Sequence, residues 1–258
     1  MHSGELMPEA VAIISDIHAN LEALEAVLAD IDRQGIETIY CLGDVVGYGP
    51  DPAACLDRVM DRCAFTIMGN HDHAVFIEPT GFNTPAETSV FWSRQRLNAE
   101  PGEQRRLRRW EFVARMRAFR KMDSLLFVHG SPQRPLHDYL FPDEATLNLS
   151  HLVQVFDLFG RVCFVGHTHL PGVFTETYEF LSPAKVGKAY TLGSRKAIVN
   201  VGSVGQPRDL DPRACYATLS GREVRWHRVP YDHKGTMEKI LATGVLDEFL
   251  ANRLADGR

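Results

Sequence analysis

Side chains that can bind metal ions recur directly after short apolar segments of this 258-residue sequence. Nitrogen and oxygen ligands without a thiolate suit manganese, iron, cobalt, nickel or zinc better than copper(I) or calcium. The pattern therefore predicts a site for divalent transition metals. Its candidate ligands are Asp16, His18, Asp44, Asn70, His129, His167 and His169.

Metal ions would balance a cluster of this composition. Burying two aspartates, four imidazoles and an amide without partners would cost on the order of several kcal/mol of hydration. Asp16 and His18 are two residues apart, and so are His167 and His169, so in an extended segment each pair points its side chains the same way. Two cations could then satisfy the lone pairs of the whole cluster.

Such a pair of ions would carry a definite chemistry. Four positive charges against two carboxylates leave a net positive site, which suits a phosphate group. Two ions about 3.5–4 Å apart would clamp the attacking and leaving oxygens of a displacement at phosphorus. A water that bridges both ions would ionise near neutral pH and supply the nucleophile. The expected reaction is hydrolysis of a phosphate ester.

Alternating strands and helices would position these side chains. Apolar runs predict short strands, and apolar residues at helical spacing after Asn20 and after Asp51–Pro52 predict helices between them. Right-handed βαβ units of this kind build a largely parallel sheet of the α/β class, whose carboxyl edge binds ligands. The expected strands of this part cover residues 11–15, 36–42 and 64–68.

The rest of the chain departs from this rhythm. Residues 76–123 read as a helical, basic insertion within a single domain that covers residues 1–258. Residues 143–159 read as mostly helical, and a polar helix over about 234–254 closes the chain. The remaining expected strands cover residues 125–128, 162–165, 172–177, 197–201, 216–219 and 224–229.

Composition limits the class of protein. With 45% hydrophobic and 24% charged residues, the chain has the composition of a globular protein. Its five cysteines are scattered and include no C-x-x-C pair, which is typical of reduced thiols in a cytoplasmic protein. Residues 1–10 lack the pattern of a secretory leader, and no apolar run reaches the roughly 18 residues of a membrane span. We therefore expect a cytoplasmic protein without a membrane partner.

Basic residues gather in the predicted insertion. The stretch from Arg94 to Lys121 holds ten of the 28 basic residues and three glutamates, a net charge of +7 in a chain of net charge −5. Such a run is usually a solvated helix face, although it could also meet a polyanion. The negative overall charge argues against a nucleic-acid surface, and so does the lack of aromatic residues that alternate with the arginines beyond Trp110 and Phe112.

Taken together, five motifs resemble those of the calcineurin-like metallophosphoesterases, in the order of that family and spread over most of the chain. The resemblance is to the small bacterial branch described as phosphodiesterase-like or as similar to diadenosine tetraphosphatases. Residues 200–208 resemble the segment that follows the last motif in that branch. The motifs are Asp16-x-His18, Gly43-Asp44, Gly69-Asn70-His71-Asp72, His129 and Gly166-His167-Thr168-His169.

The resemblance implies a fold and a set of roles. The fold is a four-layer α-β-β-α sandwich of two mixed sheets flanked by helices. The cofactors are two divalent metal ions, with manganese or iron favoured, and the partner is a small phosphate ester, nucleotide-type or other. His71 takes the place of the catalytic histidine. By the same resemblance Asp16, His18 and His169 hold one metal, Asn70, His129 and His167 the other, and Asp44 bridges them.

One motif departs from the pattern. Serine/threonine phosphatases and symmetrical dinucleotide hydrolases of the family continue the second motif as G-D-x-x-D-R-G, whereas this chain reads Gly43-Asp44-Val45-Val46-Gly47-Tyr48-Gly49. The departure argues against a specialised protein phosphatase. Arg208 could supply the missing phosphate contact, and Asp72 could orient His71. A non-catalytic interaction module on the same fold is the alternative, but such modules typically lose the histidine that this chain keeps.

Overall fold

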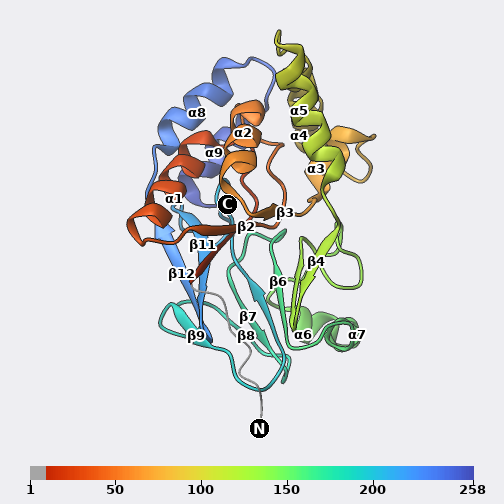
Figure 1. Ribbon diagram of the computed structural model, residues 1–258, viewed down its shortest axis with the longest axis vertical. Helices are drawn as coiled ribbons and strands as arrows, with labels where there is room; N and C mark the ends of the chain where they lie inside the picture. The colour runs from red at the N-terminus through yellow and green to blue at the C-terminus, as the bar shows by residue number, and fades with distance from the viewer. Residues whose placement is uncertain (1–9) are drawn as a thin grey trace.

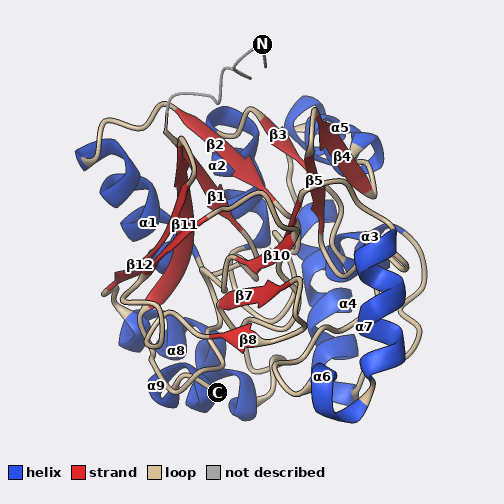
Figure 2. Cartoon of the chain, turned by 90° about the horizontal axis from the view of Figure 1, so that it is seen from below, coloured by secondary structure: helices blue, strands red, loops and turns tan. Residues whose placement is uncertain are grey.

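The computed structural model describes residues 10–258 and contains two six-stranded sheets between helices (Figure 1, Figure 2). The prediction that residues 1–10 lack a secretory leader concerns a segment that, except for Ala10, lies outside the described residues. In order across the first sheet the strands are β3 (Phe65–Thr66), β2 (Thr38–Cys41), β1 (Val11–Ile14), β11 (Ala214–Ser220), β12 (Glu223–Val229) and β9 (Ala189–Thr191). The second sheet runs β4 (Phe119–Met122), β5 (Leu125–Val128), β6 (Val162–Val165), β10 (Ala197–Asn200), β7 (Gly172–Thr175) and β8 (Phe180–Leu181).

Both sheets are mixed, with the parallel pairs grouped together in each. Strands β1, β2 and β3 are parallel, and so are β5, β6 and β10. The remaining pairs are antiparallel, so the largely parallel sheet expected from the first third of the chain describes only part of each sheet. Strands β11 and β12 follow each other through a two-residue turn at Gly221, too short for a parallel crossover.

Alternation along the strands divides the interior into three apolar layers. In β1, Val11 and Ile13 face the other sheet, whereas Ala12 and Ile14 face the helices. In β6, Phe164 faces the first sheet and Cys163 faces the helical layer on the opposite side. Because central strands such as β1 and β6 bury both faces, each sheet needs a partner on both sides. The four-layer α-β-β-α sandwich of two mixed sheets is thereby confirmed.

Helices cover the outer face of each sheet. Asn20 accepts a hydrogen bond from the Ala23 amide and caps the first helix, as its sequence predicts. No helix within residues 10–258 combines the length and apolarity needed to cross a bilayer. The helices are α1 (Leu21–Arg33), α2 (Pro52–Arg62), α3 (Asn70–Phe76), α4 (Thr84–Asn98), α5 (Glu103–Arg115), α6 (Glu144–Leu147), α7 (Leu149–Asp157), α8 (His233–Ala242) and α9 (Glu248–Asp256).

The single C-terminal helix expected over 234–254 is wrong. Two helices, α8 and α9, occupy that stretch, and Gly244 between them has a φ of +61°. A backbone in the left-handed region ends a helix, and glycine adopts it at little cost. The break lets Ile240, Leu250 and Leu254 meet in one small apolar cluster, which a straight helix could not form.

The stretch expected as an insertion, residues 76–123, contains α4, α5 and the edge strand β4. Several of its arginines pair with acidic residues, some of them on the neighbouring helix α2. Arg109 is buried and pairs with Asp57 of α2 and with Glu100, and Arg108 pairs with Asp61. The basic face is therefore partly neutralised by α2, which favours the structural interpretation of this charge run over a polyanion surface.

Candidate metal centre

The seven predicted ligands lie where strands of both sheets end. Asp16 and His18 follow β1, Asp44 follows β2, and Asn70 follows β3. The second sheet contributes His129 after β5, and His167 and His169 after β6. All seven are buried, and the most exposed of them, Asn70, is 7% accessible. The structure therefore brings the whole predicted set together between the carboxyl ends of the two groups of parallel strands.

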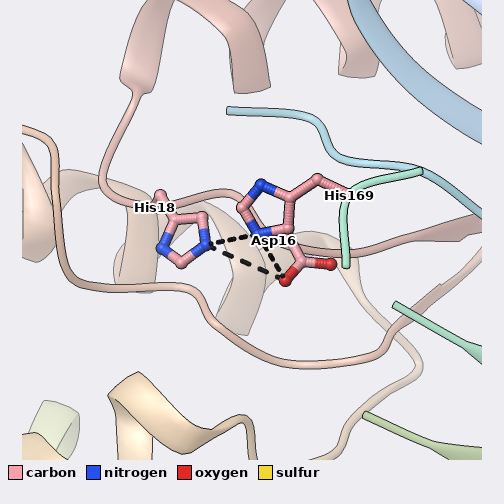
Figure 3. Close-up of side chains that lie close together, drawn as sticks. All are labelled: Asp16, His18 and His169. Carbon is pink, nitrogen blue, oxygen red and sulfur yellow. Dashed lines mark hydrogen bonds and ion pairs between the residues drawn. The ribbon is translucent and has the colours of Figure 1, made fainter. Parts of the chain in front are cut away.

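One group of three ligand atoms comes from β1 and β6 (Figure 3). The Nε2 atoms of His18 and His169 are 3.1 Å apart, and His169 Nε2 lies 3.2 Å from Asp16 Oδ1. His18 Nε2 lies 3.8 Å from the same oxygen. Three lone pairs converge on one small volume, which is the arrangement of a metal site.

A second group comes from β2, β3, β5 and β6. His129 Nε2 is 3.0 Å from His167 Nδ1 and 3.1 Å from Asn70 Oδ1. Asp44 Oδ2 lies 3.3 Å from His129 Nε2 and 3.7 Å from His18 Nε2 of the first group. Asp44 is therefore the carboxylate that stands between the two groups.

Hydrogen bonds to the far nitrogens fix the imidazole tautomers. The Nδ1 atoms of His18, His129 and His169 lie 3.3, 2.9 and 2.5 Å from the carbonyl oxygens of Val46, Leu42 and Gln206. A carbonyl can only accept, so each Nδ1 carries the proton and each Nε2 offers a lone pair to the centre. Metal-binding histidines in proteins are oriented in this way.

In both carboxylates, one oxygen accepts a backbone hydrogen bond and the other lies toward the imidazoles. Asp16 Oδ2 accepts the amide hydrogen of His167 at 3.0 Å, while the buried Oδ1 has no hydrogen-bond partner within residues 10–258. Asp44 Oδ1 accepts the amide hydrogen of His71 at 2.8 Å and leaves Oδ2 toward the imidazoles. A buried carboxylate oxygen without a partner is costly, so the residues present fit a bound cation.

Electrostatics within the cluster favour anionic carboxylates. Burial alone would raise the pKa of Asp16, but His169 and His129 beside it hold the pKa well below its usual range. Burial alone would likewise lower the pKa of His129, but Asp44 and Asp16 raise it to about 9. In the metal-free chain, His129 thus carries the cation that balances the two carboxylates at neutral pH. A bound metal ion would take over that charge.

The backbone at the ligands is held in an uncommon conformation. Asp16, His18, Asp44, His167 and His169 all have φ between +49° and +65°. Aspartate and histidine tolerate this left-handed region better than most residues, but it still carries a cost. The loops also approach closely, because a Cβ on Gly43 would lie 2.4 Å from the Gly69 amide nitrogen.

Histidine 71 lies beside the two groups with its ring in a largely aromatic pocket. Its ring centroid is 4.4 Å from that of Tyr48, 4.8 Å from Phe82 and 4.9 Å from His18. Its buried Nδ1 has no hydrogen-bond partner among the described residues. Burial, opposed by Asp44, lowers the pKa of His71 to about 4, so the imidazole is neutral at pH 7.

The suggestion that Asp72 orients His71 is wrong. Asp72 Oδ1 accepts the amide hydrogens of Val45 and Val46 at 2.9 and 3.2 Å, and Oδ2 accepts that of Gly69 at 3.1 Å. The carboxylate therefore fixes the loops after β2 and β3 and has no contact with the imidazole. Burial raises the pKa of Asp72 to about 7.

Arg208 lies next to this pocket and has no carboxylate partner in the part of the chain that the structure describes. Its Nη2 donates to Gln206 Oε1 at 2.9 Å, and its guanidinium carbon lies 5.9 Å from the centroid of the Tyr48 ring. The buried Nε has no partner within residues 10–258. An unpaired, partly buried guanidinium beside a candidate metal centre is available to an anion.

The profile of the calcineurin-like phosphoesterase superfamily domain matches residues 10–223, which include all seven candidate ligands and His71. The chain belongs to the calcineurin-like phosphoesterase superfamily. This membership confirms the resemblance read from the five motifs. Together with the ligand groups it supports a metal-dependent phosphoesterase.

Two similar proteins each align with 98% of this chain. An uncharacterized protein of Methanocaldococcus jannaschii is 36% identical over 258 residues, which cover 98% of this chain and 100% of the relative. A metallophosphoesterase from Sphaerobacter thermophilus is 34% identical, with a TM-score of 0.83 over 98% of this chain and 100% of that one. A Pyrococcus horikoshii protein, 19% identical, shares the fold with a TM-score of 0.74 over 97% of this chain and 99% of its own.

A cleft of about 420 Å³ opens from the candidate metal centre to solvent. Its walls include aromatic side chains that the sequence did not single out. Tyr139 stacks on the His167 ring with centroids 3.8 Å apart, while Tyr48 and Phe82 flank His71. Tyr48 belongs to the second motif, which departs from G-D-x-x-D-R-G. That departure is the sequence signal that could have pointed to Tyr48. The other lining residues are Asn70, Thr80, Gly81, Asn83, Ala86, Arg134 and His137.

A charged network behind the cleft holds the loop after β5. His151 Nε2 lies 2.9 Å from Asp138 Oδ2, and its Nδ1 lies 2.6 Å from Glu144 Oε1. Asp138 also accepts a hydrogen bond from Ser131. His151 therefore ties α7 to the loop that carries Arg134 and Tyr139.

This network predicts a pH-dependent stability. Burial would lower the pKa of His151, but the hydrogen bond to Glu144 and the charge of Asp138 raise it above the usual value. A raised pKa in the folded state stabilises the fold fully below the unfolded value, about 6.5, and this contribution is lost as pH rises through the folded value. We expect His151→Gln to lower the free energy of unfolding by about 1 kcal/mol at pH 6 and by clearly less at pH 9.

Urea unfolding of the wild type and the variant at the two pH values measures this difference. His233→Gln is the matched control, because His233 forms no ion pair among the described residues. A destabilisation by His151→Gln that is equal at pH 6 and pH 9 would contradict the role assigned to the charge.

Proposed function

We propose that the chain is a two-metal phosphoesterase that hydrolyses phosphate mono- or diesters of nucleotide-type or other small molecules. The observation that carries the proposal is the pair of converging nitrogen groups, His18 with His169 and His129 with His167, separated by Asp44. Fixed tautomers and an unpartnered Asp16 oxygen support cation binding at this place.

Each ligand has a proposed place. When bound, the two divalent ions, manganese or iron by preference, would supply charge for the phosphoryl oxygens and ionise a bridging water near neutral pH. One ion would be held by Asp16, His18 and His169, the other by Asn70, His129 and His167, and Asp44 would contact both. Hydrogen bonds to the carbonyls of Val46, Leu42 and Gln206 hold three of these imidazoles in a fixed orientation.

The remaining site residues act on the substrate. His71, neutral at pH 7, would donate a hydrogen bond to a phosphoryl oxygen or a proton to the leaving group. Arg208 would contact the same phosphate from the Tyr48 side, in place of the arginine missing from the second motif. The five cysteines, all unpaired, support a reducing, cytoplasmic setting for this chemistry.

A metal-reconstituted hydrolysis panel tests the proposal. Purified protein is dialysed against chelator, reloaded with Mn²⁺, Fe²⁺, Zn²⁺, Ni²⁺ or Co²⁺, and assayed for bound metal by mass spectrometry. An aryl phosphomonoester, an aryl phosphodiester, cyclic nucleotides and dinucleoside polyphosphates are then compared. We expect about two ions per chain and turnover that chelator abolishes. Absence of metal after reloading would contradict the mechanism, and full loading without turnover of any ester would indicate a non-catalytic module.

A further inference from the structure

The cleft beside the candidate metal centre is lined by one arginine and by no acidic residue. Among the residues that line it are Arg134 and His137, and none is an aspartate or a glutamate. Arg134 is exposed, and no carboxylate within residues 10–258 lies at ion-pair distance from it. Arg109, by contrast, is buried and pairs with Asp57 and Glu100. Arg134 is thus an uncompensated charge that faces the cleft.

The nearest acidic residue in the sequence, Asp138, does not neutralise it. The Asp138 carboxylate is occupied by His151 and by the hydroxyl of Ser131. Its side chain therefore belongs to the network behind the loop, while Arg134 and His137 face the cleft. The loop thus holds the Asp138 carboxylate away from the cleft and presents Arg134 to it, so the positive charge of Arg134 remains available to a ligand.

The backbone around Arg134 is rigid. Ser131 Oγ accepts the amide hydrogens of Gln133 and Arg134 at 3.2 and 3.3 Å. The Arg134 carbonyl accepts those of His137 and Asp138 at 3.2 and 3.3 Å, and the Gly130 amide donates to Pro135. A side chain on such a closed loop loses less freedom on binding than one on an open loop. The base of the arginine is therefore preorganised.

We propose that Arg134 recognises a second anionic group of the substrate, most simply a second phosphate, apart from the phosphoryl group at the metal centre. The inference rests on the proposed function, because it presumes that a phosphate ester occupies the centre. Arg208 and His71 already serve the reacting phosphate on the Tyr48 side, whereas Arg134 stands on the loop after β5. The aromatic walls at Phe82 and Tyr139 fit the organic part between the two anions.

The experiment uses ligands that cannot be hydrolysed. A series of α,ω-alkane bisphosphonates with one to five carbons is compared, length for length, with alkyl monophosphonates. Binding to Mn²⁺-loaded protein is measured by calorimetry, and inhibition of aryl phosphate turnover is measured in parallel. The ratio of the two dissociation constants reports only the second anionic group, and any chelation of free metal is the same for every protein variant.

We expect a bisphosphonate of at least one length to bind about tenfold or more tightly than its monophosphonate. Arg134→Gln should abolish that ratio, and Arg134→Lys should keep part of it because the charge remains. Arg115→Gln is the matched control, since Arg115 is exposed on α5 and does not line the cleft; it should keep the wild-type ratio.

Three results would overturn the inference: no bisphosphonate advantage at any length, an advantage that survives Arg134→Gln, or an equal loss for both ligands in that variant. The last would show that Arg134 contacts the reacting phosphate itself. Failure of the proposed function looks different, because protein that binds metal and phosphonates but turns over no ester leaves the calorimetric ratio measurable.

Discussion

Replacing Asp44 by asparagine is expected to remove both metal ions and the phosphoesterase activity in one step. Asp44 Oδ2 lies within 3.7 Å of an imidazole nitrogen from each ligand group, so its negative charge is shared by both groups. The asparagine oxygen can still accept the His71 amide hydrogen, and the local fold should persist. Loss of outer-shell partners alone costs about 10- to 100-fold in metal affinity, and loss of a bridging charge should cost more.

The rate should fall with the metal. Metal ions contribute several kcal/mol to a displacement of this kind, which corresponds to about a thousandfold or more in turnover. Metal content by mass spectrometry and turnover of an aryl phosphate measure the two effects on the same preparation. Asp61→Asn, an exposed change on α2, should retain both. Full metal content in Asp44→Asn would refute the bridging role.

The second large effect is expected for His71→Asn, which should keep its metal and lose turnover. Among the described residues, the buried Nδ1 of His71 has no partner, and the ring contacts Tyr48 and Phe82 on the side of the cleft. General acid–base groups or hydrogen-bond donors at such a position contribute about 10²- to 10⁴-fold. We expect a loss of this size with about two ions still bound.

The leaving group separates the two roles open to His71. With a pKa of about 4 the imidazole is neutral and a weak proton source at pH 7, so we expect it to donate a hydrogen bond to a phosphoryl oxygen. The loss should then be equal for a nitrophenyl ester, whose leaving group needs no proton, and for an alkyl ester. A much larger loss with the alkyl ester would identify His71 as the proton donor, and loss of metal would show that its role is structural.

The ligand set could be predicted because each ligand is marked by its place in the sequence, directly after an apolar strand. A polar side chain directly after an apolar strand lies at the sheet edge, and parallel strands bring such edges together. Asp16, Asp44 and His129 could therefore be grouped without knowledge of the tertiary structure. Their assignment to particular ions stays a prediction.

Other features depend on contacts that the sequence does not display. Gly244 is a local signal for the end of a helix, but the sequence alone does not show that a second helix, α9, then packs against α8. His151 carries no motif, and its role depends on Asp138 and Glu144 meeting it in space. Tyr139 stacks on His167 from a loop whose path is fixed by hydrogen bonds to Ser131. The contacts of such residues are visible only in three dimensions.

The left-handed backbone at five of the seven ligands bears on how this fold can evolve. Each such residue costs on the order of 1–3 kcal/mol that a glycine would not pay. Replacing a ligand such as His18 by glycine would remove a crowded, buried polar group together with its backbone cost, which offsets part of the packing that is lost. A ligand position that no longer serves a metal could therefore accept glycine with part of its lost packing offset, so the same loops can persist in a relative that has lost the ligand set.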